Sequence, residues 1–219
     1  MEQVIIGVMH PKGGTGKTAT TINASIGLAE KLGYDVVSIF DLDKQKQMTK
    51  FANNRERNGL KKLNVIDFKD DEDFKEKLQN QKGIVLIDTG GFDSSSNRLV
   101  ALVSDLIILP LNNSDQEIDG LRDFQMNLKE IFDVNENLKC KVLVNRVHFN
   151  DNSTQKAFEE YLSNFDNFST FNTSIPHNKA FGSLLSTGMS VSEMDLDSIH
   201  LKLRINKFIN ELEEEINNG

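Results

Sequence analysis

The chain alternates between short, continuously apolar segments and longer segments in which apolar residues recur at helical spacing. The apolar runs predict strands at 3–9, 35–40, 63–67, 83–88, 105–110, 140–145 and 168–173. The periodic segments predict helices at 17–32, 45–57, 71–81, 95–103, 117–132, 153–164, 179–187 and 198–217. This alternation predicts an α/β fold, with a mostly parallel sheet covered by helices on both faces. Ligands bind such sheets at the carboxyl ends of the strands.

No Pro/Gly/Ser-rich linker and no internal repeat interrupts the pattern, so we expect one domain over residues 1–219. A chain of 219 residues is long enough to bury a sizeable core, and its 38% apolar and 26% charged residues are ordinary for a soluble protein. The first residues do not resemble a secretory signal, and no stretch approaches 18 apolar residues. We therefore expect a cytoplasmic location.

Charge and cysteine content exclude several classes of function. With 25 basic and 33 acidic residues the net charge is −8, which disfavours a protein whose whole surface adsorbs to nucleic acid but allows a local basic patch. The single cysteine, Cys140, lies in an apolar run and is expected to be a small buried side chain. One cysteine permits no disulfide and no cysteine-rich metal site within a chain, which also disfavours a carrier of metal clusters.

The segment Pro-Lys-Gly-Gly-Thr-Gly-Lys-Thr at 11–18 joins the first predicted strand to the first predicted helix. Its glycines let backbone amides approach phosphate oxygens, and the helix that follows adds positive charge at its first turn. We expect Lys17 to reach the β- and γ-phosphates and Thr18 to ligate Mg²⁺. Glycine turns between a strand and a helix are also common without any ligand. Three glycines followed by Lys-Thr nevertheless favour a nucleoside triphosphate.

Aspartates follow two further predicted strands. Asp41 and Asp43 leave the strand 35–40, and Asp88 ends the apolar run 84–87 before a glycine turn. Because carboxyl ends of parallel strands meet at one edge, these carboxylates are expected beside the triphosphate, where Asp88 holds Mg²⁺ through a water. The alternative for Asp41 and Asp43 is a turn followed by a helix N-cap, two places where aspartate is common.

Together these motifs resemble the ParA/MinD family of deviant Walker A ATPases. The resemblance rests on the lysine at each end of the glycine loop (Lys12 and Lys17), the Asp-x-Asp-x-Gln segment at 41–45, the strand ending at Asp88 and the pair Asn145-Arg146. It extends from residue 3 to about residue 212 and is nearest to small ParA-type plasmid partition ATPases without an N-terminal helix-turn-helix domain. It implies a P-loop NTPase three-layer sandwich and a Mg²⁺-dependent ATPase.

The resemblance also implies a role for each matching position. Family members sandwich two ATP molecules between two subunits, and Lys12 matches the lysine that crosses to the partner's phosphates. Asp43 matches the carboxylate that orients the attacking water, while Asp41 and Asp88 match the pair that holds hydrated Mg²⁺ together with Thr18. With Lys12 and Lys17, Asp43 completes the expected catalytic set. The expected nucleotide contacts are Lys12, Gly13, Gly14, Thr15, Gly16, Lys17, Thr18 and Ala19 around the phosphates and Asn145, Arg146, Ile175 and Pro176 around the adenine.

Three segments depart from the family pattern. Lys44 stands where such ATPases have proline, so the geometry of the segment after Asp43 is less constrained. Gly90-Gly91 follows Asp88-Thr89 where proline or alanine is usual, which permits more backbone freedom. Asn178 occupies a position where arginine is common.

The resemblance implies a role in partition of plasmid or chromosomal DNA. In such a role ATP-bound dimers bind DNA non-specifically on the nucleoid, and a ParB-type centromere-binding adaptor stimulates hydrolysis. Candidate phosphate contacts are His200, Lys202, Arg204 and Lys207 at the start of the last helix, with Lys179 nearby. A solvated helix face is the alternative interpretation of these residues.

A MinD-like ATPase that cycles on a membrane is the rival class. It needs a basic amphipathic C-terminal helix, and the last helix does carry an apolar stripe: Leu201, Ile205, Phe208, Ile209, Leu212 and Ile216. Glu211 and the run 213–215 would face an anionic bilayer unfavourably, so we expect this stripe to be core and expect no membrane partner. An ATPase that positions another cargo on the nucleoid would use the same residues.

Overall fold

Every pair of neighbouring strands in the described part of the sheet is parallel. In the computed structural model, residues 2–91, 95–112, 115–149, 151, 153–196 and 198–218 are described. The strands are β1 (Val4–Val8), β2 (Val37–Asp41), β3 (Asn64–Ile66), β4 (Ile84–Asp88), β5 (Leu106–Leu111), β6 (Lys139–Val147), β7 (Phe168–Thr170) and β8 (Ile175–Pro176). Their order in the sheet is β3-β2-β4-β1-β5-β6-β7, and β8 pairs with β6.

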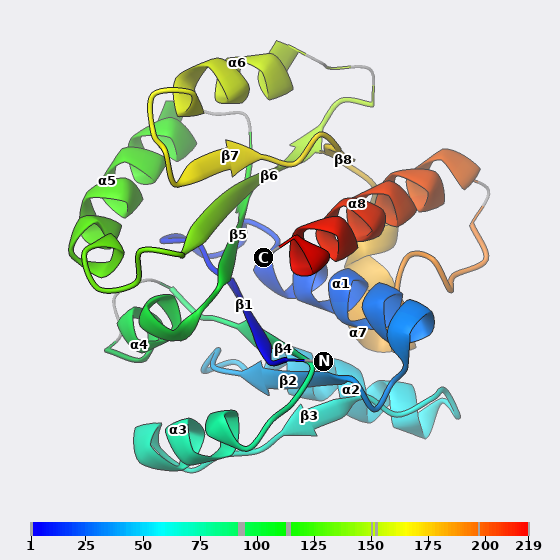
Figure 1. Ribbon diagram of the computed structural model, residues 1–219. Coiled ribbons are helices and arrows are strands. Elements are labelled where there is room, and N and C mark those ends of the chain that lie inside the picture. The colour runs from blue at the N-terminus through cyan, green and yellow to red at the C-terminus, as the bar shows by residue number, and fades with distance from the viewer. Residues whose placement is uncertain are drawn as a thin grey trace.

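Helices cover both faces of this sheet (Figure 1). They are α1 (Lys17–Leu32), α2 (Gln47–Arg57), α3 (Asp71–Gln79), α4 (Ser95–Val103), α5 (Asp115–Phe132), α6 (Ser153–Leu162), the 3₁₀ turn η1 (Lys179–Ser183), α7 (Leu184–Thr187) and α8 (Ile199–Asn217). Apolar side chains of α1, α2, α7 and α8 form one core cluster with one face of the sheet, and those of α3, α4, α5 and α6 form a second with the other. The predicted three-layer fold is therefore confirmed.

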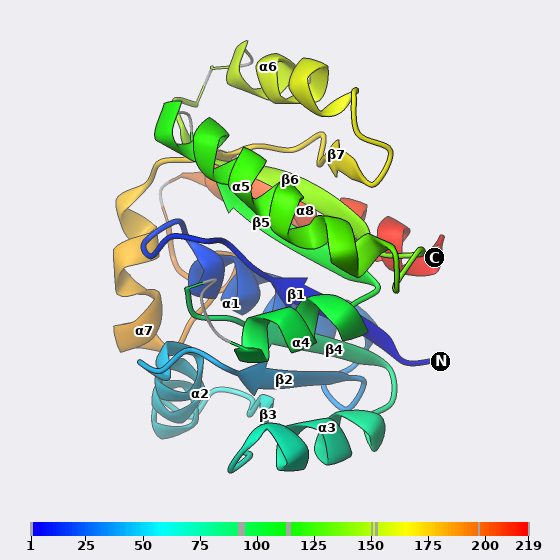
Figure 2. The same cartoon turned by 90° about the vertical axis from the view of Figure 1, so that its left-hand side faces the viewer.

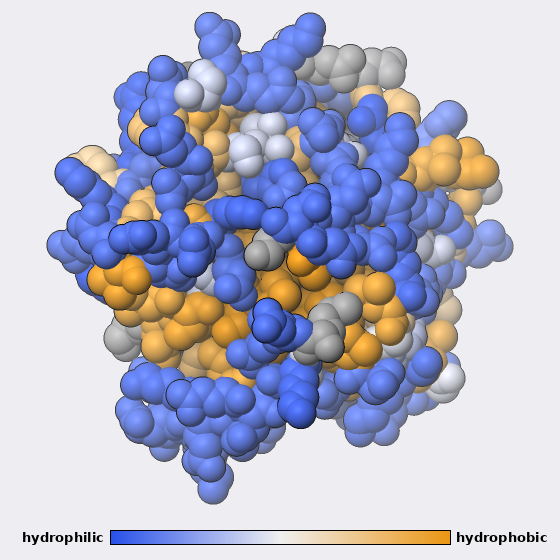
Figure 3. Space-filling view, in the orientation of Figure 1, coloured by the Kyte–Doolittle hydropathy of each residue, from blue (hydrophilic) through white to orange (hydrophobic). Residues whose placement is uncertain are grey.

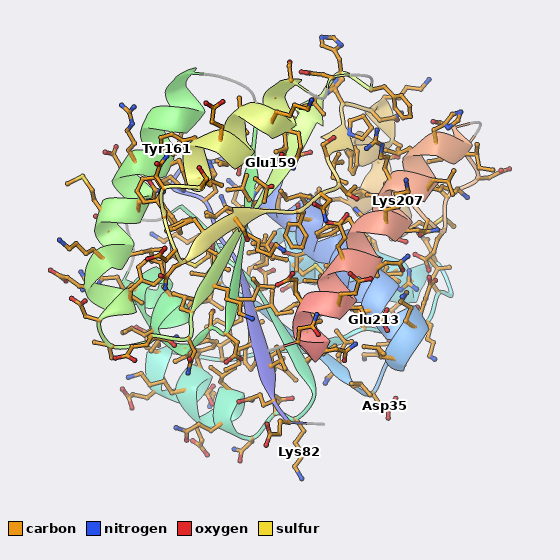
Figure 4. All side chains as sticks on the ribbon, turned by 45° about the horizontal axis from the view of Figure 1, so that its top comes forward. Asp35, Lys82, Glu159, Tyr161, Lys207 and Glu213 are labelled. Atoms are coloured by element: carbon orange, nitrogen blue, oxygen red, sulfur yellow. The ribbon has the colours of Figure 1, made fainter. Side chains whose placement is uncertain are left out.

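The apolar stripe of α8 belongs to the core, as expected, because every residue of that stripe is buried. Its acidic end is bound to the body of the protein: Glu211 accepts from Thr173, Glu213 pairs with Lys31 of α1, and Glu215 pairs with Lys141 of β6. Figure 4 labels Glu213 on this helix. Among the described residues no helix is both long and apolar enough to span a bilayer.

The structure differs from the prediction in the bounds of several helices and strands. The strand expected at 35–40 begins at Val37, because Gly33, with φ of 115°, ends α1 and a turn follows it. The segment expected to be one helix over 179–187 divides into η1 and α7, and the strand expected over 168–173 ends at Thr170. β8 has only two residues and was not predicted.

The register of the sheet places the predicted site. β1 lies between β4 and β5, and the loop that joins it to α1 leaves the carboxyl edge. Val8 is the register partner of Asp88, and Asp88 is in turn the partner of Asp41. The loop 9–16 and these two carboxylates therefore meet at one edge of the sheet. Figure 2 shows that edge on the left, with both chain termini on the right.

Candidate functional site

The loop between β1 and α1 has the backbone shape that its glycines permit. Gly14 and Gly16 take φ of 77° and 104°, a left-handed conformation that favours glycine. α1 begins at Lys17, whose side chain is buried and whose ammonium donates to the Lys12 carbonyl at 2.9 Å. The Thr15 hydroxyl oxygen is buried without a hydrogen-bond partner among the described residues. This loop is compact, positively charged and supplied with backbone donors, which suits it to a phosphate chain.

Asp88 is a buried carboxylate that contacts the first turns of α1, directly after this loop. Thr18 donates its hydroxyl to Asp88 Oδ2 at 2.8 Å, and Thr21 donates to Oδ1 at 3.0 Å. Burial raises the pKa of Asp88 to about 7, an increase that Asp41 and Asp43 reinforce and the two hydroxyl donors oppose. Nothing in the glycine-loop motif pointed to Thr21, whose contact depends on the turn of α1 against β4.

Asp41 ends β2 and is held from one side by Thr49 of α2. The Thr49 amide and hydroxyl both donate to Asp41 Oδ2 at 2.8 Å, and the Asp43 amide donates to Oδ1 at 3.2 Å. Asp43 Oδ1 accepts from the Gln45 amide at 2.8 Å, so this carboxylate does form part of a turn. Neither aspartate is the N-cap residue of α2, because Lys46 occupies that position, but Asp41 does accept from the Thr49 amide in the first turn of this helix.

A cavity of about 450 Å³ opens beside the loop, large enough for a purine base. Of the predicted adenine contacts, Asn145, Arg146 and Ile175 line it, whereas Pro176 is buried and does not. The Asn145 amide donates to the Thr15 carbonyl at 2.9 Å and lies against Gly16, where an added Cβ would collide with it. Ala19 also lines the cavity, as do Asn23, His177 and Lys179, which were not predicted as nucleotide contacts.

His10 and Lys12 form the outer part of the loop. The Lys12 amide donates to His10 Nδ1 at 2.9 Å, and burial together with the charge of Lys17 lowers the pKa of His10 to about 4. Lys12 is exposed, and its ammonium lies against Gly120 of α5, where an added Cβ would be 3.9 Å from Nζ. His10 was not predicted as a site residue, because a histidine shortly after β1 is part of neither the glycine-loop motif nor the aspartate motifs.

The donor set fits a magnesium ion that arrives with a triphosphate. Thr18, Asp41 and Asp88 supply only oxygen atoms, which Mg²⁺ prefers, and Thr18 and Asp88 are in direct contact. Within the described part of the chain, no group of three or more His, Cys, Asp or Glu side chains is arranged to hold a metal by itself. Mg²⁺ usually takes one or two carboxylates, several waters and phosphate oxygens, so this arrangement is the expected one.

Comparisons with known proteins agree with this fold. Among solved structures, the chain resembles a plasmid partition protein from Borrelia burgdorferi B31 bound to AMPPNP (19% identity, 98% of this chain and 100% of that chain, TM-score 0.72). It also resembles pNOB8 ParA (17% identity, 99% of this chain and 99% of that chain, TM-score 0.77). A third similar structure is the septum site-determining protein MinD with Mg-ADP from Pyrococcus horikoshii OT3 (17% identity, 98% of this chain and 97% of that chain, TM-score 0.69). No curated protein matches the sequence. The family described as CobQ/CobB/MinD/ParA nucleotide binding domain matches residues 6–191 of this sequence. The chain therefore belongs to this family of nucleotide-binding ATPase domains.

Proposed function

We propose that this protein is a Mg²⁺-dependent ATPase of the ParA type that acts in plasmid or chromosome partition. The observation that carries the proposal is the glycine loop with a lysine at each end, placed beside Asp88 and Asp41 and open to a base-sized cavity. The relatives bound to AMPPNP and Mg-ADP support the choice of nucleotide. Bound Mg²⁺ would neutralise phosphate charge, held by Thr18 directly and by Asp41 and Asp88 through water.

We assign the remaining roles from the family resemblance together with the position of each residue. Lys17 holds the terminal phosphates, and Asp43 orients the water that attacks the γ-phosphorus. Lys12 lies at the exposed rim of the loop, from which its ammonium can reach the phosphates of a second subunit in an ATP-sandwich homodimer. ATP-driven dimerisation and hydrolysis then form a switch between two assembly states.

Two substitutions separate hydrolysis from assembly. Asp43→Ala should keep ATP-dependent dimerisation but lose most phosphate release, whereas Lys12→Ala should bind ATP and fail to dimerise tightly. Phosphate release and light scattering after size exclusion, with ATP and with ADP, measure the two properties. Wild-type turnover by Asp43→Ala, or tight ATP dimers of Lys12→Ala, would contradict the assigned roles.

Non-specific DNA binding is assigned to the start of α8. Lys207 is exposed on this helix (Figure 4), and the Arg204 guanidinium stacks 5.5 Å from the Phe149 ring, which also contacts His200. Lys202 and Arg204 are half-buried, so their stems pack while their charged ends can meet phosphates. Dimerisation would place two such groups together, which makes binding depend on ATP and on salt.

A charge-matched pair of variants tests this assignment. Replacing Lys202, Arg204 and Lys207 by alanine should abolish ATP-dependent DNA retention, whereas replacing Lys69, Lys75 and Lys82 near α3 should not. Retention of wild-type protein should also fall at least tenfold between about 50 and 200 mM salt. Equal retention by both triple variants, or retention that ignores the nucleotide, would refute the DNA surface.

The adaptor is the remaining partner in this proposal. A ParB-type centromere-binding protein should accelerate a slow basal hydrolysis in the nucleoid-associated, cytoplasmic protein. The test is the rate of phosphate release with and without a small basic DNA-binding protein encoded beside this chain. No acceleration by such a protein, with DNA present, would remove the adaptor from the proposal.

One observation favours membrane cycling as a second candidate function. Ile199 and Leu203 are 63% and 50% exposed on α8 beside its basic residues, and Figure 3 shows apolar surface over the start of this helix. Exposed apolar and basic side chains together suit an anionic membrane surface. Sedimentation with anionic vesicles, compared between wild type and Ile199→Ser/Leu203→Ser, decides it: ATP-dependent pelleting lost in the variant supports membrane cycling.

A further inference from the structure

The segment 41–46 runs from the last residue of β2 to the start of α2 and carries both Asp41 and Asp43, and its last residue has a strained backbone. Lys46, the N-cap of α2, takes φ of 52° and ψ of 43°, in the left-handed region. Residues with a Cβ occupy this region at an energetic cost, so neighbouring contacts must hold the conformation in place. Lys44, at the position where proline is usual in the family, is exposed and has no hydrogen bond or ion pair among the described residues.

The Lys46 side chain supplies such contacts. Its ammonium donates to the Asp41 carbonyl at 2.5 Å and lies 4.8 Å from the centre of the Phe68 ring. Phe68 in turn packs against Phe40 and Phe74, with ring centres 6.0 and 5.4 Å away. Because Phe40 immediately precedes Asp41, the ammonium is held between the start of the segment and an aromatic wall that supports β2.

The same residue closes the segment through its backbone. The Lys46 amide donates to the Asp43 carbonyl at 2.9 Å, next to the bond from the Gln45 amide to Asp43 Oδ1. Lys46 therefore bonds to Asp41 through its side chain and to Asp43 through its backbone. A single residue connects the main chain at Asp41, on the metal side, to the main chain at Asp43, the residue assigned to the attacking water.

We propose that Lys46 is a positioning residue, which fixes Asp41 and Asp43 relative to each other where a proline would otherwise stiffen the segment. The expected effect of Lys46 on hydrolysis rests on the proposed ATPase function. The expected effect of Lys46 on the conformation of segment 41–46 does not, because it concerns the protein without nucleotide. Lys46 touches neither substrate nor metal in this role, so its removal should slow turnover and leave ATP binding intact.

Hydrogen exchange of the nucleotide-free protein tests the structural part. Lys46→Asn keeps a residue that tolerates the left-handed region but is too short to reach Asp41, and Lys44→Met removes a neighbouring charge as the matched control. In Lys46→Asn the backbone amides at positions 45 and 46 should exchange about tenfold faster, whereas Lys44→Met should match wild type. Lys46→Arg should restore slow exchange, since a guanidinium can donate to the same carbonyl and stack on Phe68.

Steady-state kinetics tests the functional part. Lys46→Asn should lower kcat about tenfold with KM within about twofold of wild type, and Lys46→Arg should recover most of the loss. Unchanged exchange, unchanged kcat, or a rise in KM alone would each overturn the proposal. If wild type hydrolyses no ATP, the proposed function fails, and the exchange experiment alone decides whether Lys46 fixes the segment.

Discussion

The Thr21 hydroxyl lies 3.0 Å from Asp88 Oδ1, across 67 positions of sequence, and 3.1 Å from the Lys17 carbonyl oxygen, so its single proton is shared between these two acceptors. It thereby ties the first turns of α1 to the end of β4 at the centre of the proposed magnesium site. Thr21→Val should leave Asp88 Oδ1 short of a donor in a fully buried place, which costs about 1–3 kcal/mol of stability. Urea unfolding measures this loss, and Thr21→Ser, which keeps the hydroxyl, should recover most of it.

His10 and Asp88 should largely cancel each other's effect on pH-dependent stability. The folded-state pKa of Asp88 is raised to about 7, so its contribution is present at low pH and is lost as pH rises toward 7. The folded-state pKa of His10 is lowered to about 4, so its contribution is present above its unfolded pKa and is lost as pH falls through about 6.5 to 4.

Asp88→Asn should therefore expose the dependence on His10. Between about pH 6.5 and pH 5 the free energy of unfolding of this variant should fall by about 1.5 kcal/mol more than that of wild type. His10→Gln should show the opposite slope over the same range. Denaturant titrations at both pH values check the two slopes, and parallel curves for all three proteins would contradict the pKa values.

Gly16 should tolerate no side chain. A Cβ at this position would collide with the Asn145 amide, and φ of 104° is strained for any other residue. We expect Gly16→Ala to displace Asn145 and to weaken binding of a fluorescent ATP analogue by at least about tenfold. Gly59→Ala, which also has positive φ but meets open space far from the loop, serves as the control for backbone strain. Equal affinity in the two variants would contradict the steric argument.

Arg55 has one of the largest fully buried side chains among the described residues. It makes two hydrogen bonds to Glu193 at 2.7 and 2.8 Å and others to Gly188, Lys61 and Tyr34, joining α2 to the segment after α7. Arg55→Met should cost about 3–5 kcal/mol, because it leaves the Glu193 carboxylate without its counter-charge. Arg55→Met/Glu193→Met should be more stable than the single variant, which a double-mutant cycle by urea unfolding would show.

Much of the fold could be predicted because the evidence for it is local. α1 and α4 have the predicted boundaries, and the glycine loop, the strand ending at Asp88 and the apolar stripe of α8 all lie in contiguous sequence. Distant contacts could not be predicted in this way. Arg55 lies in a polar stretch that resembles a solvated helix, yet Glu193, 138 positions away, accounts for its burial.

The candidate site, like the fold, combines residues that local motifs predict with contacts between distant segments that they do not. The phosphate loop and its carboxylates follow from motifs, whereas the contacts of Thr21, His10 and Lys46 depend on how α1, β4 and the aromatic residues near β3 pack. Pro176 shows the converse: a motif pointed to it, but the pairing of β8 with β6 buries it away from the cavity. The roles of the individual site residues remain predictions.

Residues 2–4 and 215–218 line a common hollow of about 640 Å³ on the side of the sheet that lies away from the glycine loop. A fluorescent protein or an affinity tag attached at either end would thus lie at the edge of the sheet opposite the glycine loop, away from the proposed nucleotide site. The same closeness makes this chain a candidate for circular permutation, with a short linker across the hollow and new ends opened in a surface turn.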